Sequence, residues 1–167
     1  MNIKPFFSST KQTWKTPKLL YQALHDEFNF TFDPCPNNAK FDGLKIAWQK
    51  SNFANPPFSN QREWIKKAYE ESKEAVWKHQ EGTVGMFPDI QFKICVLLLP
   101  ARPDTKIFHE IIFPFASQIR FIKGRLHYDE AKNSALFPSM IVVFNNNWGY
   151  NEKFVSVDRD QLNLYVT

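Results

Sequence analysis

A four-residue run, Asn55-Pro56-Pro57-Phe58, carries the groups in this sequence that are best suited to chemistry. Proline has no N–H, and a residue that precedes a proline is held in an extended conformation, so consecutive prolines make a stiff, extended turn. Such a turn displays the Asn55 amide, backbone carbonyls and the aromatic face of Phe58. Hydrogen-bond acceptors beside a stacking surface can hold the flat, amino-bearing edge of a purine such as adenine.

Several short blocks occur in one order along the chain and together resemble a known family. The blocks are Trp14-Lys15-Thr16-Pro17, Phe32-Asp33-Pro34-Cys35, Asn38-Ala39-Lys40, Asp42-Gly43-Leu44, Asn55 to Ser59, Leu98-Leu99-Pro100-Ala101-Arg102 and Lys123-Gly124-Arg125-Leu126. The turn at 55–58 resembles the (Asp/Asn/Ser)-Pro-Pro-(Tyr/Phe) signature of amino methyltransferases that use S-adenosylmethionine. The ordered set, from about Trp14 to Phe144, is similar to the small phage-type DNA adenine-N6 methyltransferases (the Dam family of phages and prophages).

The resemblance implies a site-specific DNA methyltransferase, of the kind found in restriction–modification. It would move a methyl group from S-adenosylmethionine to the N6 amino group of a flipped-out adenine and leave S-adenosylhomocysteine. The N6 lone pair is delocalised into the ring, and two acceptors on its N–H groups can free it. We expect the Asn55 side-chain carbonyl and the Pro56 backbone carbonyl to be these acceptors, and Phe58 to stack on the base. Asn55, Pro56 and Phe58 are therefore the predicted catalytic residues.

The resemblance also implies where the cofactor binds. Asp33 and its neighbours occupy the place of the loop that wraps the methionine part, where Asp33 would accept from the α-ammonium. Asp42 is a candidate for the ribose hydroxyls, and Trp14 for packing on the cofactor adenine. The usual glycine-rich loop is absent, and the short separation between the Asp33 and Asn55 blocks matches the compression of the small phage family. The predicted cofactor contacts are Trp14, Thr16, Pro17, Asp33, Pro34, Cys35, Asp42 and Asn55.

The predicted partner is double-stranded DNA. The net charge of +4 and the pI near 9.0 are compatible with a polyanion but do not require one. Arg102 is expected to bind either the cofactor carboxylate or a DNA phosphate. The basic residues at 120–125 fit either a phosphate-contacting rim or a solvated strand end. We expect DNA recognition by loops 80–93 and 123–138 or by a second subunit. The predicted substrate contacts are Pro57, Ser59, Arg102, Lys123 and Arg125.

Other readings of the same residues stay open. The turn at 55–58 also suits another planar nitrogen, in an RNA adenine or a protein glutamine, and a catalytically degenerate nucleic-acid-binding module is a further alternative. Pro34-Cys35 looks like the nucleophile of a cytosine-C5 enzyme, but Cys35 follows the first predicted strand, where the cofactor is expected. The scattered histidines and two cysteines show no metal-ligand spacing, so no metal is predicted.

Hydrophobic periodicity predicts alternating helices and strands. Thr16 should cap a helix that begins at Pro17, and Asn60 with Glu63 should form the capping box of a second helix that runs to about His79. Asp104 or Thr105 should cap a short helix that Pro114 stops. Segment 80–93 is irregular, and Trp48 lies inward in a loop over 37–50. The predicted strands are Phe28 to Phe32, Ser51 to Ala54, Cys95 to Leu99, Gln118 to Ile122, Ser139 to Phe144 and Asn163 to Val166.

This order favours an α/β protein, which the resemblance makes a compact, reduced, Rossmann-like methyltransferase fold with a mostly parallel central sheet. Ligands bind such sheets at the carboxyl ends of the strands. We expect a flexible lead-in over 1–13 and a single catalytic domain over 14–167. No signal peptide or membrane-spanning run is evident, and the cysteine usage suits the reduced cytoplasm of a bacterium or infected host cell. The predicted state is a monomer or weak homodimer.

Overall fold

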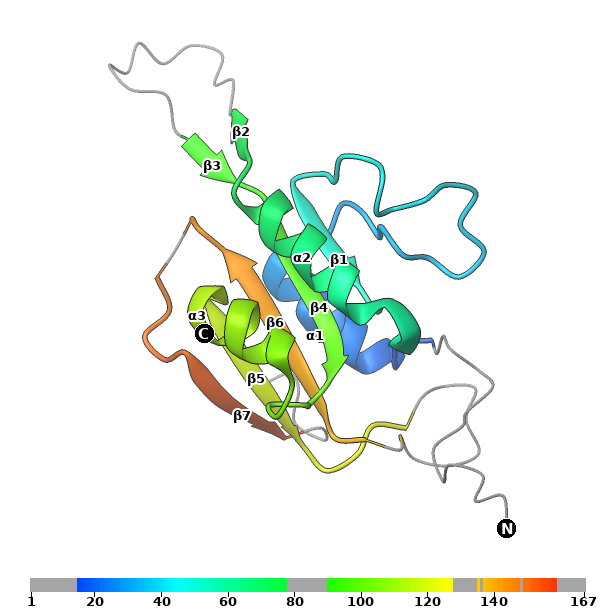
Figure 1. The fold of residues 1–167 in the computed structure, drawn as a ribbon, viewed down its shortest axis with the longest axis vertical. Helices are drawn as coiled ribbons and strands as arrows, with labels where there is room; N and C mark the ends of the chain where they lie inside the picture. The colour runs from blue at the N-terminus through cyan, green and yellow to red at the C-terminus, as the bar shows by residue number, and fades with distance from the viewer. Residues whose placement is uncertain (1–14, 78–89, 128–134, 136, 148, 159–167) are drawn as a thin grey trace.

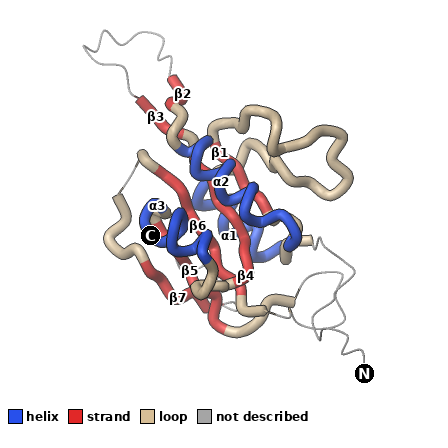
Figure 2. The backbone as a smooth tube through the Cα atoms, viewed as in Figure 1, coloured by secondary structure: helices blue, strands red, loops and turns tan. Residues whose placement is uncertain are grey.

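The computed structural model describes residues 15–77, 90–127, 135, 137–147 and 149–158. They form an α/β fold in which helices cover both faces of a five-stranded sheet (Figures 1 and 2). Helix α1 (Lys18–Phe28) packs on one face, and α2 (Gln61–Ser72) and α3 (Phe113–Phe115) pack on the other. The expected lead-in lies outside the described residues. None of the helices in the described part of the chain combines the length and apolar character needed to cross a membrane.

The sheet is mixed, with four strands that run in one direction and one that runs against them. Its order is β1 (Ser51–Ala54), β4 (Ile94–Pro100), β6 (Ser139–Asn145), β5 (Gln118–Lys123) and β7 (Phe154–Asp158). The β1–β4 and β5–β7 pairs are parallel, whereas β6 is antiparallel to both β4 and β5. Adjacent antiparallel strands need no crossover helix, and the chain returns from β5 to β6 without one of the named helices in between.

Strand β4 is the centre of the core, as predicted for a strand buried on both faces. Successive side chains of a strand point to opposite faces, so each face of β4 joins a different hydrophobic cluster. Cys95, Leu97 and Leu99 pack with α2 and the helical segment before β5. The residues between them pack with α1.

The predicted strand from Phe28 to Phe32 is wrong for most of its length. Phe28 is the last residue of α1, and Asn29 then adopts the left-handed conformation (φ 49°) with its N–H on the His25 carbonyl, which ends the helix. Only Phe32 forms a parallel bridge, with Asn52. The predicted Thr16 cap is also wrong, since Pro17 holds the N-cap position of α1 without a side-chain capping bond.

The second predicted helix ends earlier than expected. α2 stops at Ser72. The chain then forms β2 (Ala75–Trp77), which pairs antiparallel with β3 (Ile90–Phe92). β3 lies inside segment 80–93, which was expected to be irregular. The backbone of these residues thus bonds across strands instead of along a helix. Asn60 is the N-cap residue of α2 but its side chain makes no capping bond, so the capping box does not form.

The short helix before β5 passes through proline instead of stopping there. A π-helical turn over Phe108–Ile112 leads into α3, which contains Pro114. The Thr105 hydroxyl donates to the Arg102 carbonyl (2.8 Å), and the Thr105 carbonyl accepts the Phe108 N–H (3.1 Å) at the start of this helical segment. β5, β6 and β1 lie where they were predicted. The expected strand from Asn163 to Val166 lies outside the described residues.

The loop between the Phe32 bridge and β1 is held by Trp48, which is buried as predicted. Its indole N–H donates to the Gly43 carbonyl (2.8 Å), and its backbone N–H donates to the Glu71 carboxylate (3.1 Å). A Cβ on Gly43 would lie 1.9 Å from the Pro34 carbonyl oxygen. Glycine at this position therefore lets two parts of the loop pack together.

We expect Gly43→Ala to destabilise the protein by about 2 kcal/mol or more, because the added methyl group must displace backbone atoms of Pro34. Denaturant unfolding measures this change. Gly149→Ala is the matched control, since nothing lies within 4 Å of its added Cβ. Equal free energies of unfolding for the two variants would contradict this account of the loop.

Candidate active site

Adjacent parallel segments bring predicted site residues to one end of the sheet. The Phe32 N–H donates to the Ser51 carbonyl and the Phe53 N–H donates to the Phe32 carbonyl, both at 3.1 Å. This bridge runs parallel to β1, and β1 runs parallel to β4. Asp33 and Asn55 follow the Phe32 bridge and β1 directly, so both lie at the carboxyl end of the sheet, where ligands of such sheets bind.

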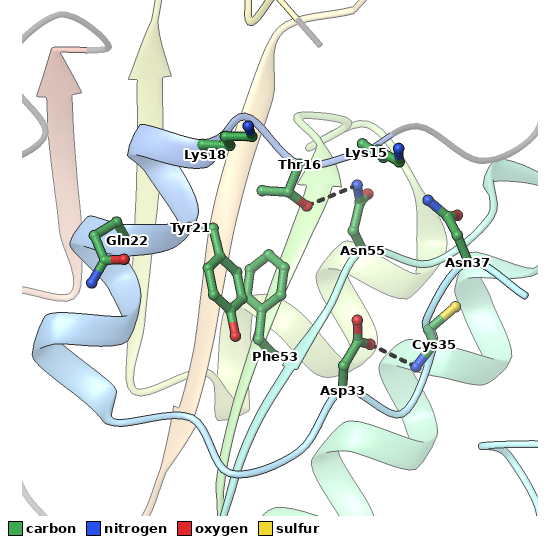
Figure 3. Close-up of a pocket in the computed structure, with 10 residues that line it drawn as sticks. All are labelled: Lys15, Thr16, Lys18, Tyr21, Gln22, Asp33, Cys35, Asn37, Phe53 and Asn55. Atoms are coloured by element: carbon green, nitrogen blue, oxygen red, sulfur yellow. Dashed lines mark hydrogen bonds between the residues drawn. The ribbon is translucent and has the colours of Figure 1, made fainter. Parts of the chain in front are cut away.

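A cavity of about 440 Å³ opens at this end, between the start of α1 and the ends of the Phe32 segment and β1 (Figure 3). Four residues predicted to bind the cofactor line it: Thr16, Asp33, Cys35 and Asn55. The remaining lining residues are Lys15, Lys18, Tyr21, Gln22, Asn37 and Phe53.

Two hydrogen bonds orient the polar side chains in the cavity. The Asn55 Nδ2 group donates to the Thr16 hydroxyl oxygen (3.2 Å), which joins the turn after β1 to the segment before α1. The Cys35 backbone N–H donates to the Asp33 Oδ1 atom (2.8 Å), a local turn that fixes the direction of the carboxylate. An amide and a carboxylate thus face the same space from neighbouring strand ends.

The surroundings perturb both acidic groups. Desolvation raises the pKa of Asp33, and the hydrogen bond from the Cys35 N–H opposes this shift. Burial and the nearby charge of Asp33 raise the pKa of the Cys35 thiol to about 11. The thiolate is the reactive form of cysteine, so Cys35 is a poor nucleophile at neutral pH.

Aromatic rings form the floor of the cavity. Tyr21 and Phe53 meet edge to face, with centroids 5.3 Å apart and an interplanar angle of 82°. Phe30 supports both rings, at 5.8 Å from Tyr21 and 5.3 Å from Phe53. Phe53 is 3% exposed, whereas Tyr21 is 37% exposed.

The sequence analysis did not identify Phe53 or the residues of α1 that line the cavity. Lys18, Tyr21 and Gln22 stand at i, i+3 and i+4, the spacing of one helix face directly after the Thr16-Pro17 block. Phe53 lies two residues before Asn55 and therefore shares its face of the strand. These spacings could have identified the residues, but only with the knowledge that this face of α1 covers β1.

The other residues of the turn lead away from the cavity. Pro56 is buried, while Pro57 and Phe58 are partly buried. Phe58 begins a short 3₁₀ turn (Phe58–Asn60) that runs into α2. Ser59 is exposed on this turn. None of these residues is among those that line the described cavity.

Asp42 lies on the surface of the loop, apart from the cavity lining. Its carboxylate accepts the Leu44 backbone N–H (3.0 Å) and pairs with Lys45 (3.2 Å). The bond from the Leu44 N–H, aided by Lys45, lowers the pKa of Asp42. Pro34 is buried beside Gly43, and Pro17 precedes α1. Trp14 lies outside the described residues.

Basic residues flank the same end of the sheet. Pro100 pairs with Ser139 and Phe121 pairs with Met140, so the residues that follow β4 and end β5 lie at a common end. Arg102 is exposed there, 3.5 Å from Asp104, with its guanidinium over the Phe137 ring. Lys123 and Arg125 are also exposed, and Lys123 lies 3.6 Å from Asp158.

The structure corrects one residue of the predicted contact regions. Arg120 is buried and pairs through both terminal nitrogens with Glu27 of α1, so it belongs to the core and not to a phosphate-contacting rim. Strand β3, within the 80–93 segment expected to contact DNA, enters the amino end of β4, opposite the cavity. Residues 80–89 lie outside the described part of the chain.

The described part of the chain contains no group of three or more His, Cys, Asp or Glu side chains placed to hold a metal ion. Comparison with protein-family models gives a match over residues 6–164 to the family described as DNA N-6-adenine-methyltransferase (Dam). No curated protein matches the sequence closely enough to be identified as a relative. Because the family match covers nearly the whole chain, the protein belongs to the DNA N-6-adenine-methyltransferase (Dam) family, transferases that methylate adenine in DNA.

Proposed function

We propose that this protein transfers a methyl group from S-adenosylmethionine to the N6 amino group of an adenine flipped out of double-stranded DNA. The observation that supports it most is the placement of Asn55 and Asp33 in one cavity at the carboxyl end of the sheet. An amide acceptor for the target amine and a carboxylate for the cofactor ammonium are the pair of groups that this reaction needs.

The donor set of the cavity fits the cofactor. Asp33 offers an acceptor for its ammonium, and Lys15 and Lys18 offer cations for its carboxylate. The volume of about 440 Å³ lies within the range of roughly 300–1,000 Å³ that is usual for small-molecule sites. When bound, S-adenosylmethionine supplies a methyl group already activated by its sulfonium. Trp14, Pro17, Pro34 and Asp42 stay expected cofactor contacts on the family resemblance alone.

The protein contributes mainly positioning and hydrogen bonding at the amine. In this mechanism the Asn55 side-chain carbonyl and the Pro56 backbone carbonyl accept the two N6 hydrogens and free the nitrogen lone pair. The bond from the Asn55 Nδ2 group to Thr16 directs the nitrogen end of the amide toward α1, so the carbonyl oxygen lies on the other side. Phe58 stacks on the base, a contact worth roughly 1–3 kcal/mol.

The substrate reaches the turn across a basic surface. Arg102, Lys123 and Arg125 contact DNA phosphates, and Pro57 and Ser59 adjoin the flipped base. Exposed cations at the cavity end supply the charge that a polyanionic substrate requires.

The direct test is transfer of labelled methyl from S-adenosylmethionine to unmethylated double-stranded DNA, followed by nucleoside analysis of the product. We expect N6-methyladenine. Label found only in RNA or in protein glutamine would assign the site to a different planar nitrogen. Cofactor binding without transfer to any of these substrates would point to a catalytically degenerate protein.

Replacing Asn55 by alanine should lower the transfer rate roughly 100-fold or more, because one of the two acceptors at the reacting nitrogen is lost. Asn55→Asp keeps a carboxylate oxygen in that position and also matches the family signature, so it should retain more activity. Single-turnover kinetics compares the variants, and thermal unfolding checks that both fold. Full activity in Asn55→Ala would remove Asn55 from the catalytic role.

Lys123→Ala should weaken DNA binding and reduce the slope of log affinity against log salt by about 1, because one phosphate contact is lost. Lys50→Ala is the matched control, since Lys50 is exposed directly before β1, at the opposite end of the sheet. Titrations of labelled duplex DNA at several salt concentrations measure both slopes. The same change in both variants would show that DNA does not approach the carboxyl end in particular.

At pH 8 the Cys35 thiol should react with iodoacetamide roughly a hundredfold more slowly than a free cysteine, because its pKa of about 11 leaves little thiolate. The rate should rise as the pH approaches 11, and peptide mass spectrometry reports it site by site. Cys35→Ser should keep methyl transfer. Rapid labelling at pH 8, together with lost activity in Cys35→Ser, would restore Cys35 as a candidate nucleophile.

A further inference from the structure

We propose that Tyr21 and Phe53 form an aromatic seat for the sulfonium of the methyl donor, so that the cavity favours the charged donor over the neutral product. This inference rests on the proposed function and adds to it a means of donor–product discrimination. It starts from the ring geometry of the cavity floor.

Tyr21 is an exposed ring on a rigid support. It meets Phe53 at 5.3 Å edge to face and stacks on His25 at 5.9 Å with an interplanar angle of 14°. Phe30 contacts all three of these rings. The cluster holds Tyr21 in place and leaves 37% of its surface exposed. Phe53, the other aromatic residue that lines the cavity, is only 3% exposed.

The position of the floor matches the position of the reacting atoms. Asn55 follows Phe53 by two residues, so both side chains lie on the same side of the chain leaving β1, as Figure 3 shows. The transferred methyl group must lie next to the amine that Asn55 holds. Tyr21 and Phe53 line the same cavity as Asn55, so a donor whose methyl group lies beside that amine can place its sulfur against their rings.

The faces of aromatic rings carry negative potential and attract cations, by about 0.5–2 kcal/mol. The sulfonium of S-adenosylmethionine is positive, whereas the thioether of S-adenosylhomocysteine is neutral. The ammonium, the carboxylate and the adenosine are common to both molecules, so Asp33, Lys15 and Lys18 act on both alike. An aromatic contact at the sulfur acts on the donor alone.

The test is calorimetric binding of S-adenosylmethionine and S-adenosylhomocysteine to the wild-type protein and to Tyr21→Leu. We expect Tyr21→Leu to raise the Kd of the donor about 3- to 30-fold and the Kd of the product less than 2-fold. Tyr21→Phe keeps the ring and should keep the ratio of the two constants. Leu19→Ala is the matched control on α1, because Leu19 is 76% exposed and does not line the cavity.

Each other outcome overturns the inference in a distinct way. Equal weakening of donor and product would place the ring against a part that they share, such as the adenine. Unchanged constants would remove Tyr21 from the site. If Tyr21→Phe lost the preference for the donor over the product, the aromatic ring face would not be the source of that preference. Should Tyr21→Leu fail to fold, Tyr21→Met gives the same comparison. Wild-type protein that binds neither molecule would overturn the proposed function itself.

Discussion

The parallel bridge between Phe32 and Asn52 decides where the candidate site forms. Two backbone hydrogen bonds hold Phe32 beside β1, so Asp33 leaves the sheet next to Asn55 although more than twenty positions separate them in the chain. The same alignment places α1 across Phe53 and Phe30, which closes one wall of the cavity. A slip of one residue in this register would turn every side chain of the Phe32 segment to the opposite face and separate the carboxylate from the amide.

The compact loop between Asp33 and Ser51 then has to be anchored without a helix of its own. Within the loop, the Trp48 indole donates a hydrogen bond to the Gly43 carbonyl. The Glu71 carboxylate of α2 accepts the Trp48 backbone N–H and so attaches the loop to that helix. Burial alone would raise the pKa of Glu71, but hydrogen bonds from Lys67, Lys93 and the Trp48 N–H outweigh it, and the pKa is lowered. The ionised carboxylate is thus the fixed point that ties the loop, α2 and the start of β4 together. This buried network holds a loop in which the structure places no helix or strand between Asp33 and Ser51.

The candidate site combines groups with different tasks on different elements. The strand ends carry the amide and the carboxylate, α1 carries Lys18 and an aromatic ring, and exposed cations lie after β4 and at the end of β5. Because these groups come from five separate segments, their arrangement depends on packing of the whole sheet and its helices. Positioning of this kind is what methyl transfer from an activated donor requires of a protein.

The sequence alone determined the features that depend on local chemistry: the stiff turn at 55–58, the buried run of β4, the inward Trp48 and the family resemblance. Local patterns failed where partners are distant. The alternating phenylalanines at 28–32 are a helix end and a single bridge, because α1 packing and the left-handed Asn29 outweigh strand propensity. Only the tertiary structure decided three other features: the reversed direction of β6, the burial of Arg120 against Glu27 and the presence of Tyr21 in the cavity. Strand direction and ion pairing between remote residues are set by which surfaces meet, and hydrophobic periodicity carries no information about that.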